Sequence, residues 1–189
     1  MEDFLTKLDM IVPLPQPCKE FLRKHLYYEE YEEKEILLKP GEISNTMAFI
    51  DYGFLQGYGP THWGMTVFRY AGKGDLYISP MSYFQQLPAV EYTQALDDTA
   101  LYELSFNDMD FALKEYEEFR NLFTAMLFKS SFRESTLKIM GTYDQEEKYQ
   151  WLIDNYYHVA AEHRMHIAKS IGLDAKGMAA LKRYNRKHE

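Results

Sequence analysis

The spacing of apolar residues between Asn107 and Gly141 predicts a long helix, around which the rest of the chain is organised. No glycine or proline interrupts the segment, and Asn107 or Asp108 is a suitable N-cap. Apolar positions recur at alternating steps of four and three, which is the seam of a coiled coil. The seam consists of Ala112, Tyr116, Phe119, Phe123, Met126, Ser130, Arg133, Leu137 and Met140.

This helix is wider on its apolar side than one seam requires, because Leu122, Leu127 and Phe128 flank it. One side would then pack on the chain's own sheet and the other on a second copy. We therefore expect a homodimer with Tyr116, Phe119, Phe123, Met126 and Leu137 at the interface. The alternative is a core helix of a monomer, because apolar stripes usually indicate burial.

Short segments of β-forming residues with alternating polarity predict seven strands between Tyr27 and Leu104. They are residues 27–31, 35–38, 46–51, 54–58, 66–70, 92–96 and 100–104. Turn signals rich in glycine, proline and aspartate separate them. Short strands punctuated in this way indicate a sandwich or barrel of the jelly-roll type.

Helical patterns predict the remaining parts of the chain. Residues 1–26 contain one or two helices broken by prolines, and residues 144–157, 162–171 and 175–187 form three more. The expected fold class is α+β. Its predicted domains are a β-roll with N-terminal helices at 1–106, a dimerisation helix at 107–141 and a small helical domain at 142–189.

Composition limits the class of protein. With 46% hydrophobic and 16% aromatic residues, the chain can bury a substantial core. No apolar run approaches the roughly 20 residues that a membrane helix needs, and the N-terminus lacks a basic signal-peptide start. Cys18 is the only cysteine, so a disulfide framework is excluded. We expect a cytoplasmic protein that makes no contact with a membrane.

Charge is distributed unevenly along the chain. The net charge of −8 argues against nucleic acid for the chain as a whole. Residues 163–189, however, carry seven Lys or Arg against two acidic residues, a net charge of +5, and leave −13 for residues 1–162. A basic end on an acidic body is typical of a small nucleic-acid-facing module. The alternative is a solvated helix end, where cations also suit the helix dipole.

Residues 34–58, KEILLKPGEISNTMAFIDYGFLQGY, resemble the opening of the cyclic-nucleotide-binding domain in Crp/Fnr transcription regulators. The likeness rests on the Pro40-Gly41-Glu42 turn, the strand at residues 47–50 and Gly53, and residues 95–101 resemble the late hairpin of that domain. It extends from about Leu14 to Lys187. The resemblance implies a double-stranded β-helix (jelly roll), a long dimerisation helix and a C-terminal helix-turn-helix that binds DNA.

The resemblance also locates a ligand site, and this chain departs from it. In that family a turn that begins Gly-Glu and ends with an Arg binds the ribose and phosphate of a cyclic nucleotide. Here Asp75 stands at the ribose position, Ala89 replaces the Arg, and Glu91 adds a negative charge. Loss of one partner of a buried charge pair costs about 3–5 kcal/mol, so cAMP is not expected to bind.

A different small-molecule effector, neutral or weakly acidic, could still occupy the roll. The candidate pocket residues are Arg69, Asp75, Tyr77, Ser79, Tyr83, Tyr92 and Gln94. The alternative for the aromatic residues among them is ordinary core packing. The identity of such an effector does not follow from the sequence.

The segment HIAKSIGLDAKGMAALKR resembles the last two helices of the family's helix-turn-helix, with Asp174 as the cap of the second helix. At the positions expected to contact bases it has Lys176, Gly177, Ala179 and Ala180, where the family commonly has a hydroxyl residue and an Arg. Cations that contact phosphates position a protein without reading sequence. The candidate DNA-contacting residues are Arg164, Lys169, Lys176, Lys182, Arg183, Arg186 and Lys187. A degenerate sensor or protein-interaction module, which keeps the fold and dimer without sequence-specific DNA binding, is the alternative.

No pattern favours catalysis or a cofactor. A metal-dependent enzyme on a jelly roll needs a His-x-His pair, and His62 is the only histidine in the strand region. His158, Glu162 and His166 recur every four residues and could share a helix face as metal ligands, but solvated histidines are the commoner explanation. We expect no enzyme, no catalytic residue, no metal site and no cofactor.

Overall fold

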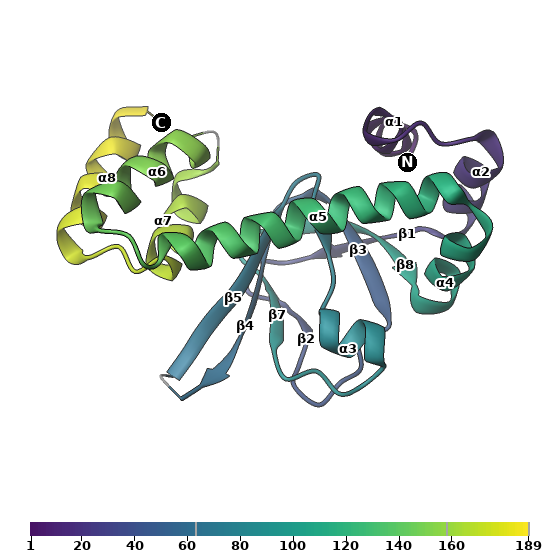
Figure 1. The fold of residues 1–189 in the computed structure, drawn as a ribbon, viewed down its shortest axis with the longest axis horizontal. Helices are drawn as coiled ribbons and strands as arrows, with labels where there is room; N and C mark the ends of the chain where they lie inside the picture. The colour runs from purple at the N-terminus through teal and green to yellow at the C-terminus, as the bar shows by residue number, and fades with distance from the viewer. Residues whose placement is uncertain (63, 158, 189) are drawn as a thin grey trace. The chain divides into compact units, whose positions relative to one another are not determined.

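The computed structural model describes residues 1–62, 64–157 and 159–188 and divides the chain into two compact units (Figure 1). The first unit is Met1–Ser131 and the second is Phe132–Glu189. Strands and helices make up the first unit, whereas the described part of the second is helical. The predicted α+β fold class is therefore confirmed.

Eight strands of the first unit form two antiparallel four-stranded sheets in the described part of the chain. One sheet has the order β1 (Tyr27–Tyr31), β8 (Thr99–Ser105), β3 (Thr46–Tyr52), β6 (Leu76–Tyr77). The other has the order β2 (Ile36–Leu38), β7 (Tyr92–Ala95), β4 (Phe54–Thr61), β5 (Gly64–Gly72). Apart from the β4–β5 hairpin, paired strands are distant in sequence, which is the jelly-roll topology that the turn spacing predicted. We call this pair of sheets the β-roll.

Alternation along the central strand β8 separates two cores. Leu101 packs between the sheets with Ile50 and Leu55. Tyr102 and Leu104 point to the opposite face, where helices cover the sheet. The inner face of β8 therefore lines the interior of the β-roll, and its outer face anchors the helices.

The helices on the outer face are α1 (Glu2–Ile11), α2 (Gln16–His25), α4 (Phe106–Glu115) and the first half of α5 (Glu117–Met140). A short helix, α3 (Pro80–Gln85), lies in the connection from β6 to β7. Buried residues of α5 in this core are Phe119, Leu122, Phe123 and Met126. One side of the first half of α5 is thus buried in the core of the first unit.

The long helix predicted from Asn107 to Met140 is two helices, and this part of the prediction was wrong. Tyr116 has an extended conformation, with φ −114° and ψ 112°, and ends α4. The Arg120 guanidinium donates to the carbonyl oxygens of Leu113 (2.6 Å) and Lys114 (3.1 Å), which satisfies the exposed end of α4. The N-cap of α4 is Ser105, whose hydroxyl accepts from the Asp108 N–H, rather than Asn107 or Asp108.

The second unit contains α6 (Gln145–Tyr156), α7 (Ala161–Ser170) and α8 (Ala175–His188), close to the predicted boundaries. Asp144 caps α6 in a capping box with Glu147. Leu152, Ile167 and Leu181, one from each helix, are buried. None of the described helices of the chain is long and apolar enough to span a membrane.

Candidate functional site

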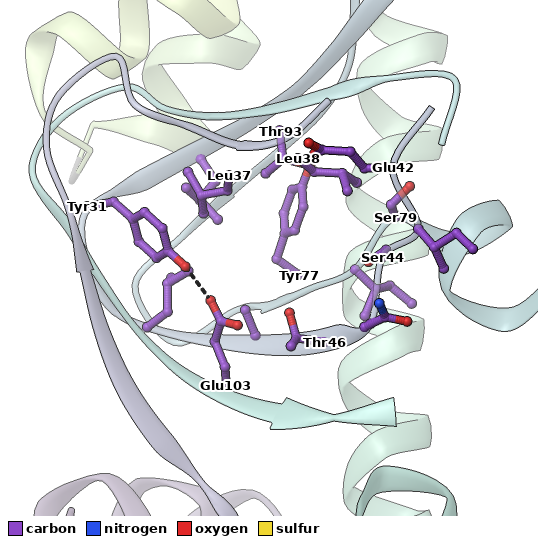
Figure 2. Close-up of a pocket in the computed structure, with 16 residues that line it drawn as sticks. Tyr31, Leu37, Leu38, Glu42, Ser44, Thr46, Tyr77, Ser79, Thr93 and Glu103 are labelled. Atoms are coloured by element: carbon purple, nitrogen blue, oxygen red, sulfur yellow. Dashed lines mark hydrogen bonds between the residues drawn. The ribbon is translucent and has the colours of Figure 1, made fainter. Parts of the chain in front are cut away.

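A cavity of about 270 Å³ lies inside the β-roll, between its two sheets (Figure 2). Strand residues such as Ala48, Leu55 and Leu101 supply its apolar walls. Its exposed rim is the loop before β3, which contributes Glu42, Ile43, Ser44 and Asn45. The remaining lining residues are Tyr31, Leu37, Leu38, Thr46, Tyr77, Ile78, Ser79, Thr93 and Glu103.

Two hydroxyl pairs organise the polar part of the cavity. The Tyr31 hydroxyl donates to Oε1 of Glu103 at 2.8 Å, and the Tyr77 hydroxyl lies 3.0 Å from the Thr93 hydroxyl. Burial raises the pKa of Tyr77 to about 12. Burial, followed by the nearby Glu103 charge, also raises the pKa of Tyr31. Both phenols are therefore protonated at neutral pH and can donate hydrogen bonds.

No lysine, arginine or histidine is found among the described residues that line the cavity. Arg69, which was predicted to meet an anion there, is not among these lining residues. Its Nη1 donates to Glu91 at 2.5 Å and to the carbonyl oxygen of Ile78 at 3.2 Å, and both side chains of the ion pair are largely buried. The charge of Arg69 is therefore neutralised by Glu91, inside the protein.

Asp75 is not a cavity residue either. One carboxylate oxygen accepts the Gly72 N–H at 2.9 Å, closing a turn in which Gly74 has φ +78°, and the other lies 3.0 Å from Lys129 Nζ. Sequence spacing alone cannot distinguish an aspartate that closes a turn from an aspartate that binds a ligand. Asp75 therefore has a structural role, connecting the β5–β6 turn to α5.

Of the other predicted pocket residues, Tyr77 and Ser79 lie at the cavity, while Tyr83, Tyr92 and Gln94 do not. Tyr83 is fully buried in the helix-side core beside Phe106. Tyr92 stacks on Tyr58, and the Gln94 amide donates to the Lys34 carbonyl oxygen at 3.0 Å.

Sequence reasoning missed Glu103, the most informative residue of the cavity. The signal was present, because an acidic residue stands two positions after the inward-facing Leu101 in an otherwise apolar strand. Thr93 and Tyr31 were missed as well, and no pattern in the sequence distinguishes them from solvent-facing strand residues.

The exposed face of α5 differs from the predicted dimer interface. Phe119, Phe123 and Met126 are buried in the core of their own unit, so they are not available to a second copy and their assignment to the interface was wrong. Tyr116 and Leu137 are half-buried. The large exposed apolar residues of α5 are Phe128 (72% exposed), Phe132 (76%) and Ile139 (55%).

In the second unit, Arg164 was predicted to face solvent, but it is buried. Its guanidinium donates to the carbonyl oxygens of Tyr156, Tyr157 and Val159, at 2.9, 2.8 and 2.6 Å, and to the side chain of Asn185. These bonds connect the end of α6 to α8. A guanidinium with this many partners inside the unit cannot also bind phosphate, so Arg164 is not a DNA-contacting residue.

The other predicted cations are exposed on α7 and α8: Lys169, Lys176, Lys182, Arg183, Arg186 and Lys187. The turn between these helices has Gly172 at φ +70°. Oδ1 of Asp174 accepts the Gly177 N–H at 2.7 Å and caps α8 as predicted. A Cβ at Gly177 would lie 2.7 Å from the Leu173 side chain, which explains glycine inside this helix.

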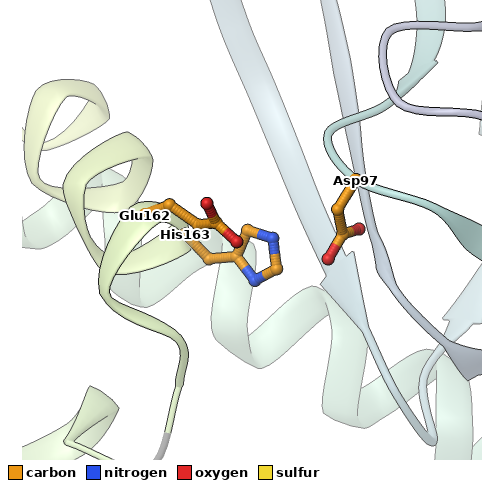
Figure 3. A group of neighbouring side chains, drawn as sticks. All are labelled: Asp97, Glu162 and His163. Carbon is orange, nitrogen blue, oxygen red and sulfur yellow. The ribbon is translucent and has the colours of Figure 1, made fainter. Parts of the chain in front are cut away.

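Among the described residues, no group of three candidate metal ligands lies within a single unit. His158 lies outside the described residues, and burial lowers the pKa of His166. Figure 3 draws Asp97, Glu162 and His163, which belong to different units. Asp97 accepts the Phe54 N–H at 2.7 Å within the β-roll. We assign no metal to these residues.

The one cysteine also lacks the properties of a nucleophile. Cys18 is fully buried in the helix-side core, and burial raises its pKa to about 11. A catalytic thiol needs a lowered pKa and access to substrate. Cys18 therefore contributes to packing.

No protein-family model matches the sequence, and no curated protein matches it. Solved structures do. The catabolite activator protein of Thermus thermophilus aligns with 96% of this chain and 87% of its own length, with 14% identity and a TM-score of 0.55. The c-di-GMP-responsive regulator CLP of Xanthomonas campestris aligns over 92% of both chains, with 12% identity and a TM-score of 0.63.

A Eubacterium rectale protein assigned to the Crp/Fnr family of transcriptional regulators aligns with 92% of this chain and 84% of its own, with 13% identity and a TM-score of 0.64. Identities this low show the fold alone. The chain therefore has the fold of the Crp/Fnr regulators, as its sequence predicted, and none of these neighbours is an enzyme by its description.

Proposed function

From this fold as a premise, we propose that the protein is a dimeric cytoplasmic transcription regulator that binds DNA through α7 and α8. The observation that carries the proposal is the exposed basic surface of α8, formed by Lys176, Lys182, Arg183, Arg186 and Lys187. It follows a glycine turn and a capped N-terminus, which is the arrangement of a helix-turn-helix. Cations on such a helix neutralise phosphates beside the major groove.

The dimer would form through the exposed apolar face of α5. Phe128, Phe132 and Ile139 are separated by four and seven residues, so they share one side of the helix. A contiguous exposed patch of large apolar side chains commonly marks a surface that a partner covers. A two-fold axis along this face would place two recognition helices about 34 Å apart, one turn of duplex.

The β-roll would act as the sensor, and cAMP would not be its ligand. Its cavity has no cation among its described lining residues, and Arg69 is paired with Glu91. A cyclic phosphate placed there would face the Glu103 carboxylate. Calorimetry at millimolar cAMP should detect no heat of binding, and a micromolar dissociation constant would contradict this part of the proposal.

A titration against duplex DNA tests the function directly. We expect the protein to bind DNA from upstream of its own gene more tightly than a random duplex, with a dissociation constant that rises steeply with salt. Lys182→Ala should weaken binding to both duplexes and reduce the salt slope by about one. Lys114→Ala, an exposed lysine on α4, is the matched control and should change neither.

A second function has its own support in α8. Ala179 is exposed and Ala180 half-exposed at positions where a recognition helix presents polar side chains to bases. A degenerate regulator, which keeps the fold and dimer but no longer reads sequence, would show the salt dependence without any preference between the two duplexes. Gain of sequence preference by Ala180→Arg would favour this second candidate.

A further inference from the structure

The cavity of the β-roll contains a buried carboxylate that no cation of the described chain neutralises. Glu103 is 7% exposed and forms none of the ion pairs found among the described residues. Its described hydrogen-bond partner is the Tyr31 hydroxyl, which donates to Oε1. Burial of a carboxylate costs several kcal/mol unless a charge or several donors compensate it. One phenol is little compensation for this cost.

The register of the sheet fixes the direction of this side chain. Glu103 pairs with Ala48 of β3 on one side and with Tyr27 of β1 on the other, in the centre of its sheet. Leu101, two residues earlier, packs between the sheets, so Glu103 also points inward. Figure 2 shows its carboxylate directed into the cavity, next to the Tyr31 hydroxyl.

The remaining lining suits a positively charged ligand. The aromatic rings of Tyr31 and Tyr77 face the cavity, and such rings attract cations through their negative faces. Thr46 and Ser79 offer hydroxyl oxygens as acceptors, and Glu42 adds a second carboxylate at the rim. A volume of about 270 Å³ exceeds the roughly 150 Å³ that holds benzene, so the cavity admits a small organic molecule.

We propose that the cavity binds a small organic ammonium ion, whose N–H groups donate to the Glu103 carboxylate and the neighbouring hydroxyls. The proposal deepens the sensor role suggested above, because it names the class of effector. It replaces the neutral or weakly acidic metabolite expected from sequence, since that expectation did not include Glu103. A metal ion is a poorer fit, because the described residues of this cavity provide no cluster of three ligating side chains.

Calorimetry with three probes of equal length tests the charge of the ligand: n-pentylammonium, 1-pentanol and pentanoate. We expect the ammonium ion to bind at least about tenfold more tightly than the alcohol, and pentanoate not to bind. A tenfold ratio is about 1.4 kcal/mol, a modest share of a buried charge interaction. Equal affinity for the ammonium ion and the alcohol, or no binding of the ammonium ion, would overturn the proposal.

Glu103→Gln tests the residue. The amide keeps an acceptor for the Tyr31 hydroxyl, so the fold should be retained, and the thermal midpoint of the ligand-free protein should not fall. The preference for ammonium should disappear. Glu29→Gln, the same change at an exposed position of the neighbouring strand, should retain it. A Glu103→Gln protein that is folded and still prefers ammonium would also overturn the proposal.

These measurements contain no DNA. Their failure would leave DNA binding by α7 and α8 untouched, whereas loss of DNA binding would not affect the probe titrations. The two proposals can therefore fail separately.

Discussion

At the residue scale, several polar side chains have structural roles that the sequence could not reveal. Arg164 is an example, because the Lys and Arg residues of the basic segment 163–189 were expected at the surface. Its planar guanidinium instead satisfies three carbonyl oxygens and Asn185 inside the helical unit. A buried polar group is tolerated when it has such partners.

Replacement of Arg164 by methionine should therefore destabilise the protein. The change leaves the carbonyl oxygens of Tyr156, Tyr157 and Val159 without their donor, and we expect a loss of about 2–4 kcal/mol in the free energy of unfolding. Urea denaturation measures this loss. Arg183→Met, at an exposed site of α8, should change stability by less than about 0.5 kcal/mol. Equal effects of the two changes would mean that the bonds of Arg164 contribute little.

Tyr83, unlike Arg164, has a buried polar group without a hydrogen-bond partner among the described residues. The side chain is fully buried, and this polar group is its hydroxyl. An unsatisfied buried hydroxyl costs about 1–3 kcal/mol. Tyr83→Phe should therefore leave the thermal midpoint unchanged or raise it by a few degrees. A clear drop in that midpoint would show that the hydroxyl has a partner, such as a bound water.

At the element scale, α8 shows how one close contact can override intrinsic propensity. Gly177 disfavours a helix by about 1 kcal/mol relative to alanine. The Leu173 side chain occupies the space where a Cβ would be, at 2.7 Å. Overpacking of this kind typically costs about 1–3 kcal/mol, which exceeds the gain in propensity.

Gly177→Ala should therefore destabilise the helical unit by up to about 2 kcal/mol, the difference between the cost of overpacking and the gain in propensity. The double variant Gly177→Ala, Leu173→Ala has room for the new methyl group. A double-mutant cycle by chemical denaturation should give a favourable interaction energy between the two changes. If Gly177→Ala alone raised stability, the packing of Leu173 against α8 would be looser than described.

The elements themselves were largely predictable, and their internal contacts were not. Alternating polarity, β-forming residues and the turn residues between them located seven of the strands. The break at Tyr116 was missed, since it has no glycine or proline and depends on Arg120 reaching back to α4. The apolar seam of α5 was correctly identified as buried on one side, but spacing alone could not tell which side faces the same chain.

The candidate site was harder to predict than the fold. Tyr77 and Ser79 were correctly predicted to line the cavity. Asp75 instead forms an ion pair with Lys129, and Arg69 forms one with Glu91. A carboxylate or guanidinium in a sequence does not indicate whether its partner will be a ligand or another side chain. That information comes only from the packed sheets.

At the scale of the whole molecule, the exposed apolar face of α5 predicts that two copies of the chain associate. Phe128, Phe132 and Ile139 remain uncovered in one copy of the chain, and the cost of that exposure favours association. Charge alone opposes it, because each copy carries a net charge of −8. Association should therefore be driven by apolar burial and should tighten as salt screens the repulsion.

Phe132→Asp should convert the proposed dimer into a monomer, because it places a carboxylate at the centre of the apolar face. Analytical ultracentrifugation at micromolar protein measures the change in mass. Met10→Asp is the matched control, since Met10 is equally exposed, at 76%, but lies on α1. A parent protein that sediments as a monomer would contradict the α5 interface.

The Arg69–Glu91 ion pair has a consequence for how the protein can be handled and regulated. The two side chains satisfy one another, so the β-roll does not depend on an incoming anion to complete its interior. The protein should purify as a folded, homogeneous species from cells that make no cyclic nucleotide. Any signal it receives must come through chemistry other than charge compensation of that guanidinium.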